Sequence, residues 1–372
     1  MSILITRYLN QSPVVSAVKH HFSTVAFFAG FLWDALTIGV KVNASDLLIL
    51  SAYLLGAIPI IWWLAKKSNP NSGCDEVFEP PEPNEDPEHW KTRLPFMLLQ
   101  FLFGSLFSAL FILYFKSSSH IAAFLWCLGL GVLLVANEFF ESAYRRFTLT
   151  WTLFGFCAIL VLNFVLPYIV GSVHAIWFFL SIILALLFTT FLKRNICPHL
   201  GNIIPAYVLA FILAAAYIFD FIPPVPLVKR DIQVGTQLTK VTGKHGVEYT
   251  LQQDKTPVWF IWRRVMTKVI HINPGEGVYC ISAIFAPAGI KTKLYHNWQL
   301  YDEKRGWVSK SRVGFDVAGG RNNGFRGYTI KTNLQYGEWR VSVETENART
   351  IAIYEFDVKK SDGDQERIAV TL

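Results

Sequence analysis

The stretch FILAAAYIFDFIPPVPLVKRDIQV, residues 211–234, contains the point at which this chain changes its fold. Its first part is apolar and rich in helix-forming residues, whereas its last part opens a basic region in which apolar and polar residues alternate. Three prolines stand between the two parts, and proline ends a helix because it lacks the amide hydrogen of a helical hydrogen bond. The stretch therefore predicts a helical domain over 1–222, a short stiff linker over 223–229 and a second domain over 230–372.

Upstream of this stretch, seven apolar segments are long enough to cross a membrane. A helix needs about 20 apolar residues to span about 30 Å of hydrocarbon, and it satisfies its own backbone hydrogen bonds there. The first segment is longer than a signal-peptide core, so we expect it to be retained in the mature protein. The seven segments lie at roughly 22–40, 46–65, 94–115, 120–139, 148–170, 173–192 and 202–222.

Lys and Arg are unevenly distributed over the connections between these segments. With the N-terminus inside, the inside connections hold ten of them and the outside connections hold two, Lys41 and Lys116. Positive connections are retained in the cytoplasm. The distribution predicts a multi-pass protein of the inner (plasma) membrane with a cytoplasmic N-terminus and a C-terminal domain that is periplasmic or extracellular. The acidic, proline-containing connection at about 68–89 is predicted to be a disordered cytoplasmic loop.

The composition agrees with a membrane protein. Hydrophobic residues make up 52% of the chain and charged residues 16%, whereas about a quarter of a soluble domain is charged. The net charge of +7 lies entirely after residue 228, in a domain predicted to be outside the cell, so we expect the lipid bilayer and not nucleic acid as a partner. No GxSxG, HExxH or Cys/His constellation occurs, and the sequence predicts no catalytic residue, cofactor or metal site.

Four carboxylates fall within or at the ends of the apolar segments, where ionisable groups are costly and often functional. Asp34 and Asp220 are predicted at a similar depth near the outer boundary. They either share a polar pocket that opens outward or lie solvated at the interface. Glu138 and Glu141 share a face at the inner end of the fourth segment, where they either act together on a metal or a proton or belong to a helix that emerges into the cytoplasm.

Downstream of residue 229 the pattern has a period of two. Leu294, His296, Trp298 and Leu300 alternate with polar residues, and similar runs recur between turn sequences such as PGEG and GGRNNG. Such alternation is typical of half-buried antiparallel strands. Roughly seven or eight of these runs predict an all-β, immunoglobulin-like antiparallel sandwich.

The order of several short motifs in this region resembles a bacterial family. An HxW motif at His296, then Trp307, GGRNNGFRGY (319–328) and GEWRVSV (337–343) follow one another as in domain-of-unknown-function family 2914. The resemblance covers about the last eighty residues and implies a membrane-anchored β domain, without an activity. The turn at residues 346–349 departs from the family because it contains no glycine.

Four residues of the C-terminal domain are candidate ligand-binding residues. Arg321 and Arg326 lie on a glycine-rich connection and suit a carboxylate, a phosphate or an acidic sugar, or else the glycines form a wide turn and the arginines are solvated. Trp307 follows a turn and is placed to stack on a ligand or to pack. His296 alternates with apolar residues, which favours a hydrogen-bonded core position over a ligand or acid–base role.

These features predict an integral membrane protein that presents its β-sandwich as a binding or sensing module for an anionic glycan, a lipid headgroup or an envelope protein. One alternative is a small transporter or intramembrane enzyme that uses Asp34 and Asp220, with the sandwich as a lid. Another is a purely structural subunit of an envelope complex.

Overall fold

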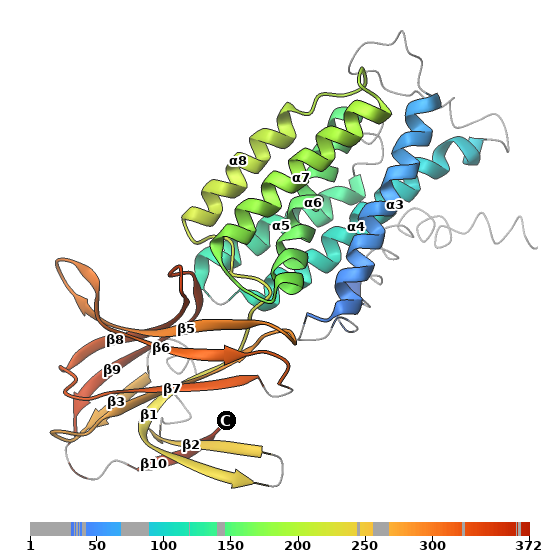
Figure 1. The fold of residues 1–372 in the computed structure, drawn as a ribbon. Helices are drawn as coiled ribbons and strands as arrows, with labels where there is room; N and C mark the ends of the chain where they lie inside the picture. The colour runs from blue at the N-terminus through green and yellow to red at the C-terminus, as the bar shows by residue number, and fades with distance from the viewer. Residues whose placement is uncertain are drawn as a thin grey trace, which may run out of the picture.

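The computed structural model describes residues 31, 32, 34, 36, 38, 42–67, 89–118, 120–139, 146–243, 246–255, 268–321, 324–361, 363 and 366–372. Over these residues a bundle of helices leads into a β domain that lies at one end of the bundle (Figure 1). The described helices are α3 (Ala44–Lys67), α4 (His89–Ser117), α5 (Ile121–Phe139), α6 (Phe147–Val170), α7 (Ala175–Ile196) and α8 (Ile204–Ile218).

Four of these helices are long and apolar enough to cross a membrane, namely α3, the part of α4 from Leu94, α6 and α7. The prediction of seven spanning helices is therefore not supported among the described residues. Most of the first predicted segment lies outside them. The last predicted segment is shortened because α8 ends at Ile218 and Asp220 adopts a left-handed φ of 61°. Its 15 residues extend only about 22 Å at about 1.5 Å per residue.

Small and polar residues hold the helices together. A side chain at Gly104 of α4 would lie 2.9 Å from Asn137 Nδ2 of α5, and a side chain at Gly155 of α6 would lie 3.4 Å from Ala206 of α8. The amide groups of Gln100 and Asn137 donate to each other's backbone carbonyls at 3.1 and 3.2 Å. Close backbone approach and interhelical hydrogen bonds are what hold helices together in an apolar environment.

The β domain consists of two five-stranded sheets, in the orders β10-β2-β1-β4-β7 and β3-β9-β8-β5-β6. The side chains of Trp298, Trp339 and Phe356 are buried in its core. Its strands are β1 (Val228–Gly243), β2 (Gly246–Asp254), β3 (Lys268–Ile272), β4 (Val278–Phe285), β5 (Lys291–Asp302), β6 (Gly306–Ala318), β7 (Phe325–Lys331), β8 (Gly337–Thr345), β9 (Thr350–Lys360) and β10 (Arg367–Thr371).

The predicted antiparallel sandwich needs two corrections. The edge strand β3 pairs with β9 in parallel, so the second sheet is mixed. The predicted number of strands, roughly seven or eight, is also too low, because the described residues form ten, with β1 and β10 paired to β2 on either side of it.

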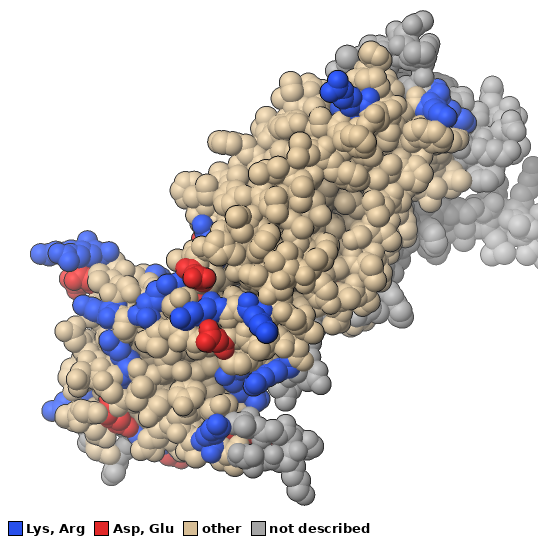
Figure 2. Space-filling model, in the orientation of Figure 1, with Lys and Arg blue, Asp and Glu red and all other residues tan. Residues whose placement is uncertain are grey.

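On the face of the bundle shown in Figure 2, charged side chains are concentrated at the two ends. Figure 2 shows tan atoms along the helices up to the junction with the β domain, and Lys and Arg at the far end of the bundle and on the β domain. The cations at the far end include Lys66 and Lys67 in the last turn of α3 and Lys193 and Arg194 in the last turn of α7. An apolar band bounded by positive charge at one end and by a polar domain at the other is typical of a membrane-embedded bundle.

Candidate functional site: the junction between helices and sheets

The turn between β8 and β9 binds the end of α8. Nη1 of Arg349 donates to the carbonyl oxygens of Tyr217 and Ile218 at 2.5 and 3.0 Å. Its guanidinium carbon also lies 4.7 Å from the centre of the Tyr217 ring. The last carbonyls of a helix have no partner within the helix and carry partial negative charge. A guanidinium supplied from a distant turn therefore caps α8.

The same turn also reaches the start of α7. Oδ1 of Asn347 accepts a hydrogen bond from the amide of Ala175 at 3.1 Å. Ala348 between these two polar residues has a φ of 55°, a conformation that glycine would adopt more easily. The absence of glycine thus accompanies a turn whose side chains contact two helix ends.

Asp220 is part of this junction. The amide of Thr350 donates to both of its carboxylate oxygens at 3.4 Å, and Arg349 Nη1 lies 3.9 Å from one of them. Nε2 of His120 donates to its backbone carbonyl at 2.9 Å and lies 3.9 Å from the carboxylate. The Asp220 carboxylate is therefore directed at the β8–β9 turn and at the start of α5.

The other predicted intramembrane carboxylates lie elsewhere. Asp34 accepts a hydrogen bond from Ser108 Oγ of α4 at 2.7 Å, so its described partner differs from those of Asp220. Glu138 belongs to α5, but its side chain and the whole of Glu141 lie outside the described residues. Among the described residues, no group of three or more His, Cys, Asp or Glu side chains is arranged to hold a metal ion.

A second contact joins the α6–α7 connection to the start of β5. The amide of Lys291 donates to the carbonyl of Gly171 at 2.9 Å. Val173, in the same connection, is buried in the core of the β domain. Besides the linker, the β domain is therefore fixed to the bundle at the β8–β9 turn and at the start of β5.

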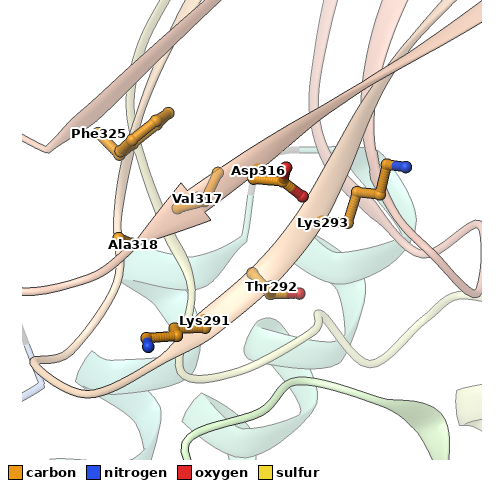
Figure 3. Close-up of a pocket in the computed structure, with 7 residues that line it drawn as sticks. All are labelled: Lys291, Thr292, Lys293, Asp316, Val317, Ala318 and Phe325. Atoms are coloured by element: carbon orange, nitrogen blue, oxygen red, sulfur yellow. The ribbon is translucent and has the colours of Figure 1, made fainter.

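A shallow pocket of about 430 Å³ lies beside this second contact (Figure 3). Its apolar lining comes from the end of β6 and the start of β7, and Lys291, Lys293 and Asp316 supply its charges. Arg321 stands next to it, because its guanidinium carbon lies 4.9 Å from the ring centre of Phe325. The pocket is lined by Lys291, Thr292, Lys293, Asp316, Val317, Ala318 and Phe325.

The four residues predicted to bind a ligand do not converge. Arg321 borders the pocket, whereas Arg326 follows Phe325 in β7 and points to the other face of that strand. Trp307 pairs with Tyr301 at the opposite end of the β5–β6 ladder and stacks under Arg340 at 4.6 Å. Ten residues of β5 separate the two ends, which is about 33 Å at about 3.3 Å per residue. Arg321 and Trp307 therefore cannot contact the same small ligand.

His296 lies in the core of the β domain. Its side chain is 0% exposed, Nε2 lies 2.8 Å from Ser282 Oγ, and Nδ1 lies 2.9 Å from Thr329 Oγ1. Trp298 Nε1 donates to the same Thr329 oxygen at 3.1 Å. Burial lowers the pKa of His296 from 6.5 to about 3, because the charged ring would lose its hydration. The ring is thus neutral at physiological pH and bonded at both nitrogens.

Close packing explains two glycines of the GGRNNGFRGY motif. A side chain at Gly327 would lie 2.3 Å from the Phe315 ring, and a side chain at Gly319 would lie 1.9 Å from the carbonyl oxygen of Pro287. These contacts require glycine for steric reasons. The packing of β7 and its preceding connection therefore accounts for Gly319 and Gly327 of the motif.

Five residues of the junction and the pocket were not predicted from the sequence as site residues: Asn347, Arg349, His120, Lys291 and Lys293. The glycine-free turn was the one signal that pointed to Asn347 and Arg349. Lys291 and Lys293 lie at a strand end with alternating charge and carry no signature of their own.

The family comparison concerns this same region. A family model described as "Protein of unknown function (DUF2914)" matches residues 291–358. The chain carries a DUF2914 domain. The predicted resemblance is confirmed. The DUF2914 domain extends from β5 into β9, so it includes Lys291 and Lys293 of the pocket and the β8–β9 turn.

The comparison with solved structures gives weak likenesses. An immunoglobulin-like protein (PA1606) from Pseudomonas aeruginosa is 11% identical, with 35% of this chain and 97% of that chain covered and a TM-score of 0.17. A β-glucosidase from Listeria innocua in complex with gluconolactone is 11% identical, covers 34% of this chain and has a TM-score of 0.18. This chain spans 16% of the length of that β-glucosidase.

The alkylpurine DNA glycosylase AlkC of Pseudomonas fluorescens, bound to DNA containing an abasic site analog, is 10% identical over 72% of this chain and 71% of that chain, with a TM-score of 0.19. At these TM-scores none of the three structures carries an argument about this protein. A comparison with curated proteins found no match.

Proposed function

We propose that this protein is a multi-pass membrane protein whose β domain lies outside the cytoplasm and acts as a binding or sensing module for an anionic envelope component or a partner protein. The observation that carries the proposal is the double attachment of the β domain to the bundle, through Arg349 and Asn347 at one place and Lys291 at the other. A module attached in this way transmits a change at its surface to the ends of α7 and α8. A module on a free linker would not.

The orientation in this proposal follows from the charges at the two ends of the bundle. Lys66, Lys67, Lys193 and Arg194 lie at the end away from the β domain, and such residues are retained in the cytoplasm. The chain enters α3 at the β-domain end (Figure 1), so a cytoplasmic N-terminus requires one more crossing, which the segment at 22–40 would supply. The proposed topology therefore counts α5 and the short α8, which packs beside α6 and α7, as crossings and has seven in all, with an immunoglobulin-like sandwich after the last.

Reporter fusions test this topology. Alkaline phosphatase fused after Leu372 is expected to be active, and green fluorescent protein at the same place is expected to be dark, since the first folds only outside the cytoplasm and the second only within it. The same pair fused within the 68–89 connection should give the reverse result. Fluorescence from the fusion after Leu372 would disprove the proposed location.

The alternative of a transporter that uses Asp34 and Asp220 has one supporting observation, the hydrogen bond of Asp34 to Ser108 inside the bundle. Asp34→Asn keeps the size of the side chain and removes its charge. In the proposed module, proteoliposomes containing wild type or Asp34→Asn are expected to show the same dye-detected leak of protons and cations as empty liposomes. A flux in the wild type that Asp34→Asn abolishes would favour the transporter.

A further inference from the structure

Basic side chains gather at the end of the β domain that faces the bundle. All six are exposed or half-buried, and they come from the starts of β1, β5 and β7 and from the β6–β7 connection. This junction cluster consists of Lys229, Arg230, Lys291, Lys293, Arg321 and Arg326. The strand register brings the starts of β1 and β7 together, since Lys229 and Phe325 both pair with Ile284 of β4, and Phe325 lines the same pocket as Lys291 and Lys293 of the other sheet.

The junction cluster begins where the apolar surface of the bundle ends. Ile169 and Val170, the last residues of α6, are 73% and 46% exposed, which is expected of side chains that face lipid. The next residue, Gly171, accepts the hydrogen bond from the amide of Lys291. The lysine is thus one hydrogen bond away from the boundary of the apolar band, at the level where the phosphates of a bilayer lie.

The pocket between these cations has the chemistry of a lipid headgroup site. Val317, Ala318 and Phe325 give it an apolar lining, and Lys291, Lys293 and Arg321 place positive charge around it against the single carboxylate of Asp316. Phe325 holds the Arg321 guanidinium over its ring, and a guanidinium binds phosphate oxygens in pairs. The apolar lining suits the glycerol and first acyl carbons of the same molecule.

Figure 3 shows the amines of Lys291 and Lys293 on opposite sides of the pocket. The cations are therefore spread along an edge and do not enclose one phosphate. Such an edge selects for negative charge in the headgroup and does not require one particular lipid species.

We propose that the junction cluster binds the phosphate-bearing headgroups of anionic phospholipids in the leaflet beside the β domain, with the pocket as the seat of one headgroup. This inference rests on the proposed function, because it needs the β domain to stand at a bilayer surface. Bound lipid would then control how firmly the β domain stays on the bundle, since Lys291 bonds to Gly171 through its backbone amide and would meet the headgroup through its side chain.

The location is tested by lysine acetylation and peptide mass spectrometry of the full-length protein in nanodiscs. Nanodiscs of phosphatidylcholine with phosphatidylglycerol are expected to protect Lys291 and Lys293 several-fold more than nanodiscs of phosphatidylcholine alone, and high salt should remove the difference. Lys304, at the far end of the same hairpin, should be acetylated equally in both. Equal acetylation of Lys291 and Lys293 in the two kinds of nanodisc would overturn the proposal.

A matched pair of variants tests the affinity. K291Q/K293Q removes two charges from the junction cluster, and K304Q/R305Q removes two exposed charges from the other end of the hairpin. Binding of short-chain phosphatidylglycerol to the full-length protein, titrated by native mass spectrometry, is expected to weaken about 25-fold in K291Q/K293Q, equivalent to about 1 kcal/mol for each lysine at about 1.4 kcal/mol for each factor of ten. K304Q/R305Q should bind as the wild type does, and equal weakening in both variants would contradict a site at the pocket.

Inorganic phosphate serves to distinguish a site for a phospholipid headgroup from a site for a free phosphate ion. Inorganic phosphate is added to the protein in phosphatidylcholine nanodiscs. If it protects Lys291 and Lys293 as strongly as phosphatidylglycerol does, the site is one for a free anion and the lipid assignment is overturned. The reporter fusions test the location of the β domain, and their result does not depend on the result of the lipid-binding measurements. A β domain that lies outside the cytoplasm without protected lysines would retain the proposed function and lose only this inference.

Discussion

Replacing Arg349 with alanine is expected to loosen the β domain from the bundle by about 2 to 3 kcal/mol. The guanidinium makes two hydrogen bonds to the α8 carbonyls, stacks on Tyr217 and neighbours the Asp220 carboxylate, and its side chain is 17% exposed. Alanine removes all of these contacts and leaves the half-buried carboxylate and the last carbonyls of α8 without the cation.

Hydrogen exchange of the full-length protein measures this loss. Exchange of the amides at 217–221 and 171–175 is expected to become about 30- to 140-fold faster, the factor that corresponds to about 2 to 3 kcal/mol at about 1.4 kcal/mol per factor of ten. The amides of β5 and β8 should keep their protection, because the core of the β domain is intact. Arg305→Ala, on the exposed β5–β6 turn, is the matched control. Unchanged exchange at 217–221 in Arg349→Ala would mean that the turn does not hold α8.

The end of α8 shows why the sequence predicted the position of a helical segment but not the residue at which the helix ends. Hydrophobicity located the segment at 202–222, but the helix ends at Ile218 because Arg349 and Thr350 bind its last carbonyls and Asp220 from about 130 residues away in the chain. No local pattern contains that partner. Asp220 was predicted near the outer boundary of the bundle, and its partners there, Arg349 and Thr350, were beyond a local pattern for the same reason.

The β domain shows a different limit. Alternation predicted correctly that His296 and Trp298 share the inward face of β5, because one face of a half-buried strand is apolar. It could not give the position of a residue along the sheet, so Trp307 and Arg321 were grouped although the β5–β6 ladder holds them at opposite ends. The parallel pairing of β3 was also beyond prediction, since it depends on the order of strands in space.

Replacing His296 is expected to change both the stability of the β domain and its dependence on pH. His296→Leu removes the partner of the buried hydroxyl groups of Ser282 and Thr329 and should lower the free energy of unfolding by about 2 to 3 kcal/mol at neutral pH. His296→Gln keeps a neutral side chain that can hydrogen-bond, so its loss at neutral pH should be smaller.

The pH dependence follows from the pKa of His296, which burial lowers to about 3 in the folded protein. In the unfolded chain the pKa is about 6.5, so above that pH the ring is neutral in both states and contributes no slope. Below it the unfolded chain binds a proton that the folded protein excludes, and stability falls by about 1.4 kcal/mol per pH unit until about pH 3. From about pH 7 to about pH 5 the free energy of unfolding of the wild type should decrease by about 2 kcal/mol because of this residue. His296→Gln should lack this contribution.

Labelling of Cys280 reads this stability in the full-length protein, because its thiol is buried in the same core and becomes reactive only when the β domain opens. Dithiodipyridine reacts at acid pH, and mass spectrometry of the Cys280 peptide separates it from the buried cysteines of the bundle. As the pH is lowered from about 7 to about 5, the urea concentration at half-maximal labelling should decrease in the wild type and decrease less in His296→Gln. All other titrating groups are common to both proteins and cancel in the comparison. If the urea midpoint depends on pH equally in the two proteins, His296 is not the group that binds a proton only in the unfolded chain.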